Sequence, residues 1–304
     1  MKMNRTDAWR TTSLNEPRGY IQPQILEELW FHTGTNCNLR CPFCFEGSKP
    51  GDNRIEFLTL ADARRFIAEA LELGVKKFSF TGGEPFVNPE LVAILDAALE
   101  QRPCLILTNA TEPLMNQMAD VLKLADKPNP LRFRVSLDHP DPSLHDESRG
   151  KGNFKKALDT LGRLHQAGFG VSIARMMLPD EDSVAVDQSY VSFFRNAGVP
   201  DDITIVKFPE FHLPGSFPNV PEVTETCMTR YLGAEQRALF MCNFSKMVVR
   251  KNGQCGVYAC TLVDDVTGYD LGPTLKSAMK ERVMLGHHRC YSCFACGASC
   301  SEGV

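Results

Sequence analysis

The chain lacks the features of an exported or membrane-spanning protein. Its longest apolar runs are short, and Asp96 interrupts the run Leu91–Leu95. No segment therefore approaches the roughly 20 apolar residues that a transmembrane helix needs. The N-terminal stretch MKMNRTDAWRTTSLNEP contains no apolar core of the kind that a secretory signal requires. We therefore expect a cytoplasmic protein with no membrane partner.

The sequence also lacks internal repeats, low-complexity segments and an excess of charge of either sign. It contains 33 Lys+Arg and 37 Asp+Glu, which gives a formal net charge of −4. This mildly acidic balance gives no electrostatic reason to expect a nucleic-acid partner. Hydrophobic residues make up 43% and charged residues 23% of the 304 residues, a mix that is typical of globular proteins and excludes wholesale disorder.

Cysteine is the residue type that the chain has in excess. Of the 12 cysteines, three lie within 37–44 and eight within 227–300. A chain of this length can bury a core without disulfides. In the absence of an export signal, clustered cysteines indicate metal or iron–sulfur ligands. Cys104 alone lies outside both regions, in the apolar run CLILT, and we expect it to be a small core residue.

Short apolar runs alternate with amphipathic stretches between residues 29 and 208. The runs predict strands at 29–34, 77–81, 105–108, 132–137, 171–176 and 203–208. Apolar residues at helical spacing predict helices at 60–73, with Thr59 as N-cap, and at 89–101, 112–125, 154–167 and 183–197. This alternation implies an α/β fold with parallel strands joined by right-handed crossovers. An open doubly wound sheet and a partial barrel both fit, and both bind ligands at the carboxyl ends of their strands.

The composition of the chain changes near residue 212. The stretch HLPGSFPNVPEVTE is rich in proline and indicates a connector. Beyond it the chain is rich in cysteine, and VVRKNGQCGVYAC predicts a β-hairpin with an Asn-Gly turn. These changes predict an N-terminal extension at 1–25, an α/β core at 26–212 and a small cysteine-rich C-terminal domain at 213–304.

The first cysteine group, Cys37, Cys41 and Cys44 in CNLRCPFC, directly follows the first predicted strand. Three thiolates on one tight loop can hold three corners of a cubane iron–sulfur cluster and leave the fourth iron open. From the spacing alone, a zinc site completed by His32 or a distant cysteine is the alternative. The TGGEP turn after the next strand favours ligand binding, because its glycines let the backbone approach a ligand closely and Glu84 can accept a hydrogen bond from an ammonium group.

CNLRCPFC and FTGGEP together resemble the radical S-adenosylmethionine (SAM) superfamily, whose signature is CX3CXφC with an aromatic residue at φ. The resemblance runs over roughly Leu29–Phe208. It implies a partial (β/α)6 TIM-like barrel in which Cys37, Cys41 and Cys44 hold a 4Fe–4S cluster. It also implies that SAM chelates the open iron and is cleaved reductively to methionine and a 5′-deoxyadenosyl radical, which abstracts a hydrogen atom from an unactivated C–H bond.

The resemblance also implies which residues contact SAM. Glu84, with its two preceding glycines, is expected to engage the methionine amino group, and Arg149 the carboxylate. Asn109 lies at the same rim, although a role as a turn residue is equally plausible. His145, in HDESRG, is expected to be a surface loop residue. The full set of expected cofactor-binding residues is Phe43, Gly82, Gly83, Glu84, Asn109, Ser136 and Arg149.

The late cysteines resemble the SPASM and twitch extensions of radical SAM enzymes, which carry auxiliary 4Fe–4S clusters. The match is imperfect, because two of the late cysteines are closer together than in the SPASM pattern and only SEGV follows the last. A single twitch-like cluster would use four of the cysteines, eight would suffice for two clusters, and a zinc ribbon is the alternative from spacing alone. The expected ligands are Cys242, Cys260, Cys290, Cys293, Cys296 and Cys300, followed by Cys255 and Cys227.

The resemblance predicts a radical SAM oxidoreductase in which an auxiliary cluster assists oxidation or rearrangement of a small-molecule substrate, of natural-product or cofactor type. An electron donor such as flavodoxin or ferredoxin is the implied protein partner, and Cys255 and Glu210 are candidate catalytic residues. A maturase of a ribosomally made peptide is an almost equal alternative. The small-molecule reading is preferred because only about 25 residues precede the first strand, too few for a leader-recognition domain. Methyl or sulfur transfer and a non-catalytic zinc-binding module are further alternatives, but the module gives the GGEP turn no role.

Overall fold

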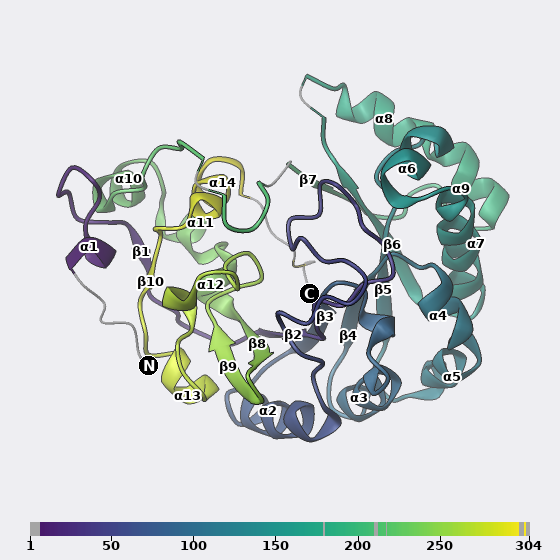
Figure 1. Ribbon diagram of the computed structural model, residues 1–304, viewed down its shortest axis with the longest axis horizontal. Coiled ribbons are helices and arrows are strands. Elements are labelled where there is room, and N and C mark those ends of the chain that lie inside the picture. The colour runs from purple at the N-terminus through teal and green to yellow at the C-terminus, as the bar shows by residue number, and fades with distance from the viewer. Residues whose placement is uncertain (1–6, 179, 210–211, 217, 298–300, 302–304) are drawn as a thin grey trace. The chain divides into compact units, whose positions relative to one another are not determined.

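The computed structural model describes residues 7–178, 180–209, 212–216, 218–297 and 301. The chain forms two compact units (Figure 1). Unit 1 comprises Met1–Trp30, Arg65–Lys76 and Pro214–Val304, and unit 2 comprises Phe31–Arg64 and Lys77–Leu213. The boundary between Trp30 and Phe31 falls within the strand Glu28–His32, so that each unit contains part of this strand.

Unit 2 is built on parallel strands whose order in space follows their order in the chain. Neighbours pair in parallel from β3 to β7, and the order is β7-β6-β5-β4-β3-β2. Such an order is typical of successive right-handed βα units. It confirms the predicted α/β class and partial TIM-like barrel. The strands are β2 (Glu28–His32), β3 (Lys77–Thr81), β4 (Cys104–Thr108), β5 (Leu131–Ser136), β6 (Gly170–Met176) and β7 (Ile205–Phe208).

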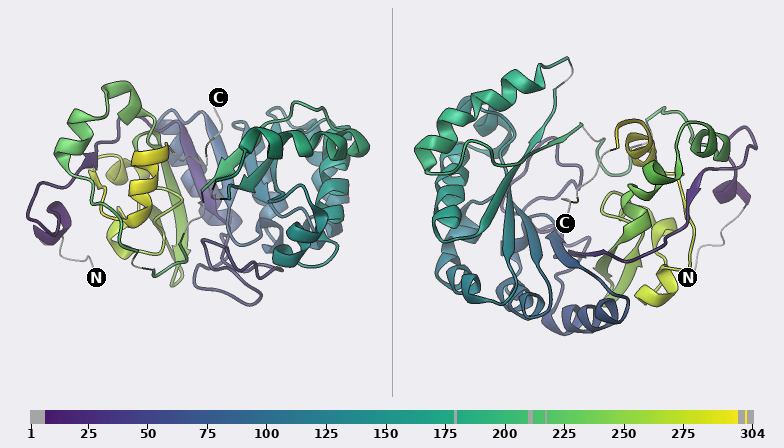
Figure 2. Two further views of the ribbon diagram at one scale, coloured as in Figure 1. Left: turned by 90° about the horizontal axis from the view of Figure 1, so that it is seen from above. Right: turned by 180° about the vertical axis from the view of Figure 1, so that it is seen from behind.

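Most of helix α2 (Leu60–Glu72) belongs to unit 1. The helices that follow the other strands lie along the outer side of the curved sheet of unit 2 (Figure 2, right). Two predicted helices are interrupted in the structure. The stretch 112–125 forms three short helices, and 183–197 forms two that meet at Tyr190, whose buried side chain donates a hydrogen bond to Leu137 O at 2.7 Å. The helices are α2 (Leu60–Glu72), η1 (Pro85–Val87), α3 (Leu91–Leu99), α4 (Glu112–Asn116), α5 (Met118–Leu122), η2 (Lys123–Asp126), α6 (Pro142–Arg149), α7 (Asn153–Gln166), α8 (Ser183–Ser189) and α9 (Val191–Ala197).

The core of unit 2 follows from the apolar strands. Phe31 stacks on Phe80, with ring centroids 5.3 Å apart, and also contacts Phe78. All three rings are fully buried, and each contributes roughly 1.5–3 kcal/mol of burial free energy. Cys104 is 2% exposed in β4, which confirms its expected role as a core residue. Thr59 caps α2 as predicted, because its Oγ1 accepts a hydrogen bond from Asp62 N at 3.1 Å.

Unit 1 contains the predicted hairpin. Strands β8 (Ser245–Lys251) and β9 (Gln254–Tyr258) pair antiparallel, and Asn252 and Gly253 at the turn have φ of 51° and 72°, as a type I′ turn requires. A second antiparallel pair joins β1 (Tyr20–Ile21) to β10 (Val283–Met284). None of the described helices is both long and apolar enough to cross a bilayer. The helices of unit 1 are α1 (Asp7–Arg10), α10 (Glu225–Arg230), α11 (Ala234–Ala238), α12 (Met241–Phe244), η3 (Thr267–Tyr269), α13 (Leu275–Ala278) and α14 (His288–Cys296).

Candidate functional site

Three cysteines lie on one loop at the carboxyl end of β2. Cys37 is 8% exposed, and Cys41 and Cys44 are half-buried. Burial raises the pKa of the Cys37 thiol to about 12, and the nearby Cys41 and Cys44 thiols act in the same direction. A bound cation would reverse this shift, because metals bind and stabilise the thiolate form. The loop therefore holds three thiols close together, and a bound cation would favour their thiolate forms.

The two glycines of the TGGEP turn let this turn pack directly against the start of the cysteine loop. A Cβ atom on Gly83 would lie 2.5 Å from Asn36 O, and one on Gly82 would lie 2.7 Å from Gly34 O. The backbones are joined by hydrogen bonds from Gly83 N to Gly34 O at 2.9 Å and from Glu84 N to Asn36 O at 3.1 Å. Any side chain at either glycine would push the turn away from the cysteines.

Glu84 is 2% exposed, and three donors hold its carboxyl group in place. Its Oε1 accepts from Thr108 Oγ1 at 2.8 Å and from Phe86 N at 3.2 Å, and its Oε2 accepts from Asn109 N at 2.8 Å. Burial raises its pKa to about 7, although these hydrogen bonds act in the opposite direction. The group is thus rigid and close to the point of ionisation, and a cationic ligand would favour its charged form.

Asn109 connects the end of β4 to the cysteine loop. Its Nδ2 donates to Asn38 Oδ1 at 2.9 Å, and its Oδ1 accepts from Thr111 N and Oγ1. Asn38 lies between Cys37 and Cys41 in the sequence. The amide donor of Asn109 therefore holds the cysteine loop directly, and its amide acceptor holds Thr111, whose Oγ1 accepts from Asn38 Nδ2 at 2.9 Å.

Arg149 lies near the same loop. Its guanidinium forms an ion pair with Asp138 through Nε, and its Cζ lies 5.6 Å from the centre of the Phe43 ring. The Arg149 charge also lowers the pKa of Cys41, against the larger effect of burial. Ser136, at the end of β5, is half-buried. The structure thus brings Phe43, Asp138 and Arg149 together beside the thiols.

The expectation that His145 is a surface loop residue is wrong. The side chain is 1% exposed in α6, its Nδ1 accepts a hydrogen bond from Asp138 N at 3.3 Å, and its ring packs edge-on against Phe154. Burial lowers its pKa to about 4, and the Arg149 charge adds to this effect. The neutral ring therefore supports the loop that carries Asp138. Asp141 as N-cap and a proline at the next position are the signals that could have placed His145 in a helix.

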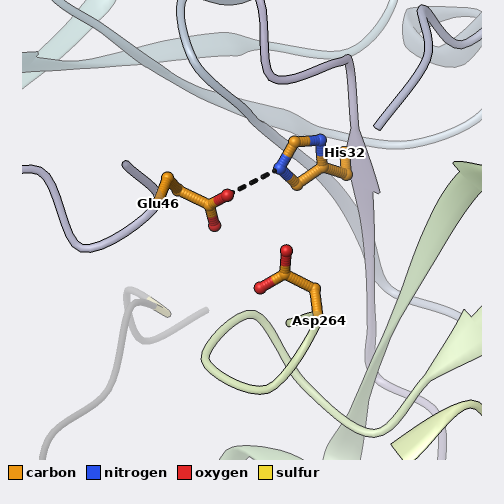
Figure 3. Close-up of side chains that lie close together, drawn as sticks. All are labelled: His32, Glu46 and Asp264. Carbon is orange, nitrogen blue, oxygen red and sulfur yellow. Dashed lines mark hydrogen bonds and ion pairs between the residues drawn. The ribbon is translucent and has the colours of Figure 1, made fainter. Parts of the chain in front are cut away.

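His32, the alternative zinc ligand, uses both ring nitrogens within unit 2. Its Nδ1 accepts from Gly34 N at 3.2 Å, and its Nε2 lies 3.2 Å from the Glu46 carboxylate, toward which it points in Figure 3. Glu46 follows Cys44 by two residues, and its carbonyl accepts from Arg54 Nη2 at 2.7 Å. The pair joins β2 to the far end of the cysteine loop.

A second group of cysteines lines one apolar cavity in unit 1. The cysteines come from α12, from the residues after β9 and from the first two turns of α14. The rest of the cavity wall includes Met241, Leu262, Tyr269 and Leu285. Burial raises the pKa of each of Cys242, Cys260 and Cys290, to about 12 for Cys242. The four cysteines are Cys242, Cys260, Cys290 and Cys293.

The remaining candidates lie elsewhere. Cys255 is half-buried in β9 opposite Arg250, and Cys227 lies in α10, where its Sγ accepts from Thr224 Oγ1 at 3.2 Å. Neither lines the cavity. Glu210, Cys300 and the side chain of Cys296 lie outside the part of the chain that the structure describes.

The described cysteine sulfurs are not preset as a site for a single metal ion. Among the described residues, no three cysteine sulfurs lie within 4.8 Å of one another. A tetrahedral zinc ion with Zn–S bonds of about 2.3 Å would hold its sulfurs about 3.8 Å apart. In a cubane cluster each thiolate binds a different iron, so the sulfurs stand further apart. Among the described residues, neither group therefore holds three sulfurs already at the separation that one zinc ion requires.

Two buried cations beside the second group were missed by sequence reasoning. Lys246 is fully buried in β8, and Arg289 is 1% exposed in α14 and lines the cavity. Burial lowers the pKa of Lys246 to about 8, while the thiols of Cys242 and Cys260 act to raise it. A signal was present, because Lys246 opens the otherwise apolar run MVV four residues after Cys242.

Residues 31–189 match the model of the radical SAM superfamily. The chain belongs to this superfamily. Radical SAM enzymes use a 4Fe–4S cluster and SAM, so the predicted enzyme class and cofactors are confirmed. The matched range contains the cysteine loop, the TGGEP turn, Asp138 and Arg149, and it ends before the second cysteine group.

Curated relatives of the chain include GTP 3′,8-cyclases. The chain is 35% identical to the enzyme of Streptomyces coelicolor over 153 residues, which are 47% of this chain and 42% of the relative. It is 30% identical to the enzyme of Tolumonas auensis over 139 residues, 44% of this chain and 39% of the relative. The chain thus spans less than half the length of these curated relatives.

Solved structures with a similar fold include peptide complexes. Streptococcus suis SuiB bound to the precursor peptide SuiA matches with a TM-score of 0.63 and 17% identity, over 84% of this chain and 65% of that chain. The structure of anSMEcpe with AdoMet and the Kp18Cys peptide matches with a TM-score of 0.58 and 15% identity, over 84% of this chain and 81% of that chain. At this identity the likeness concerns the fold.

Proposed function

We propose that this radical SAM enzyme abstracts a hydrogen atom from a substrate C–H bond and uses an auxiliary 4Fe–4S cluster in unit 1 to oxidise or rearrange the substrate. One observation supports this proposal above all others. The chain holds two separate groups of cysteines, one on the loop after β2 and one around a single apolar cavity of unit 1. One group offers three thiols and the other four, which suits one cluster with an open iron and one with closed coordination.

In the proposed active site, Cys37, Cys41 and Cys44 hold the cluster that binds SAM. When bound there, the cluster would supply the electron for reductive cleavage of SAM. Burial beside the glycine turn shields Cys37 from water, while Cys41 and Cys44 are half-buried. Two side chains near the cysteines, Glu84 and Arg149, offer the opposite charges that an amino acid group requires.

Each of these charged residues is given one task. Glu84 accepts a hydrogen bond from the ammonium group of SAM, and the three donors on its carboxyl group fix the direction of that bond. Arg149, oriented by Asp138, faces the SAM carboxylate. Phe43, beneath the guanidinium, packs near the adenine. Asn109 holds the cysteine loop through Asn38, which makes it a positioning residue.

The proposed auxiliary ligands are Cys242, Cys260, Cys290 and Cys293, within the predicted domain 213–304. Four cysteines suffice for one fully ligated cluster, and these four share one apolar cavity. The cavity shields the cluster from water, and buried cations lie beside it. Cys255 is left outside this set, so that it stays a candidate proton or hydrogen-atom donor.

We propose a small-molecule substrate, because the curated relatives with up to 35% identity are named for a cyclisation of GTP. A peptide substrate is the second candidate. It is favoured by the solved structures that match more than four fifths of this chain and contain a precursor peptide or the Kp18Cys peptide.

The test is anaerobic reconstitution with iron and sulfide, followed by SAM and dithionite with pools of deuterated small molecules or deuterated peptides. The proposal predicts formation of 5′-deoxyadenosine and deuterium transfer into it from the small-molecule pool. Transfer from the peptide pool alone would support the second candidate. The absence of 5′-deoxyadenosine from a protein with a full complement of iron would contradict the proposed reaction.

A further inference from the structure

A buried ammonium group lies beside the four-cysteine cavity. Lys246 is fully buried, and its Nζ donates hydrogen bonds to Cys242 O at 2.7 Å and to Ser245 O at 2.8 Å. These two carbonyl groups fix the ammonium next to the backbone of Cys242. The thiols of Cys242 and Cys260 lie close enough to act on it electrostatically.

A second cation belongs to the cavity wall itself. Arg289 is 1% exposed, and its Nη1 donates to Leu262 O at 3.0 Å. It precedes Cys290 in the first turn of α14, where the backbone N–H groups add positive potential. The nearby carboxylate of Asp265 is paired with His287 at 3.2 Å. The cavity thus has an apolar lining and a positive surrounding.

Burying these two positive charges costs free energy unless the cavity holds negative charge. A buried ammonium loses its hydration, and two neutral carbonyl groups replace only part of it. An iron–sulfur cluster with four thiolate ligands carries a net negative charge, and its one-electron reduction adds one further negative charge. A fixed positive charge therefore stabilises the reduced state more than the oxidised state, and this difference raises the reduction potential.

We propose that Lys246, assisted by Arg289, raises the reduction potential of the auxiliary cluster so that it can take an electron from the substrate. This inference rests on the proposed function of the four-cysteine cavity. In the step that benefits, the substrate radical left by hydrogen-atom abstraction loses one electron and one proton. The auxiliary cluster, held by the four cysteines, would take up the electron, and the proton would go to solvent. Lys246 acts through its charge and touches neither substrate nor SAM.

The experiment is a redox titration followed by electron paramagnetic resonance. It uses the reconstituted full chain in which Cys37, Cys41 and Cys44 are replaced by Ala, so that the auxiliary cluster alone gives a signal. In this background Lys246→Met removes the charge and keeps the length of the side chain, while Lys246→Arg keeps the charge. Lys251→Met is the matched control, because Lys251 lies on the same strand but donates to Asp264 O at 2.6 Å and stacks on Tyr258.

The proposal predicts that Lys246→Met makes reduction at least about tenfold less favourable, which is 59 mV for a one-electron couple. Lys246→Arg and Lys251→Met should stay within about twofold of the parent. A potential unchanged in Lys246→Met at full iron content would overturn the proposal. If Lys246→Met takes up no iron, Arg289→Met decides by the same criterion, and loss of iron from both variants also counts against a purely electrostatic role. Absence of iron and sulfide from the parent itself would instead overturn the proposed function.

Discussion

The two cysteine groups differ in how the chain builds them. In unit 2 the three cysteines lie within eight consecutive residues of one loop, two of them half-buried, with Glu84 and Arg149 nearby. In unit 1 the four cysteines come from three separated segments and line one apolar cavity, beside two buried cations. The first group is a local motif held by its neighbours, whereas the second exists only when unit 1 is folded.

This difference indicates different demands on the two sites. A site that must bind and release SAM needs an accessible metal and charged groups of both signs. A site that only stores or passes an electron benefits from closed coordination and a dry surrounding, which fix its potential. Loss of metal should therefore damage chemistry in the first site and folding in the second.

The largest expected effect is from Cys260→Ala, with Cys255→Ala as the matched control from the same hairpin region. Cys260→Ala should lose about four irons per chain, since one ligand of a four-cysteine site is gone. It should also lower the free energy of unfolding by on the order of 3–5 kcal/mol, because metal binding joins three segments of unit 1. Iron counting and denaturant unfolding under anaerobic conditions measure both. Equal iron loss in the two variants would show that Cys255 is needed as much as Cys260, and would contradict the assignment of the site to four cysteines of one cavity.

A smaller effect is expected from Glu84→Gln, which keeps the size of the side chain and removes its charge. SAM affinity should fall by about tenfold, or ~1.4 kcal/mol, as measured by equilibrium binding to the reconstituted protein. Because burial raises the pKa of Glu84 to about 7, wild-type affinity should rise between pH 6 and pH 8, and the variant should show no such rise. Glu112, on α4, forms an ion pair with Lys156. The control variant Glu112→Gln should bind SAM like the wild type. A pH-independent wild-type affinity would argue against a charged Glu84.

A third prediction concerns His145, which supports Asp138 in unit 2. Its folded-state pKa is lowered from 6.5 to about 4 by burial, so the unfolded chain binds more protons between these values. Stability should therefore fall as the pH drops from 6.5 to 4, by about 2–3 kcal/mol. His145→Gln, whose amide oxygen can accept from Asp138 N, should remove this slope. Urea unfolding at several pH values measures it, and an identical slope in the two proteins would contradict this role.

Sequence reasoning predicted what is encoded locally. The strands and most helices of unit 2 follow from apolar periodicity, and the cysteine loop and glycine turn follow from motifs of a few residues. The break at Tyr190 depends on a hydrogen bond to Leu137, which is 53 residues away. The burial of His145 depends on contacts with Asp138 and Phe154. Neither is visible in a local window.

The second cysteine group shows the same limit more clearly. The spacing of the late cysteines left open which four would meet and whether one or two clusters were expected. Cys242, Cys260 and Cys290 converge only through the packing of α12, the hairpin and α14. The sequence shows a lysine at position 246, but its burial and its proximity to the thiols depend on the fold.

The most direct test of two clusters in two units is to count iron and acid-labile sulfide after anaerobic reconstitution. It should be done on the wild type and on the variant with Cys37, Cys41 and Cys44 replaced by Ala. The account predicts about eight irons and eight sulfides in the wild type and about four of each in the variant, with 5′-deoxyadenosine formed by the wild type alone. Twelve irons, or tightly bound zinc without sulfide, would contradict it.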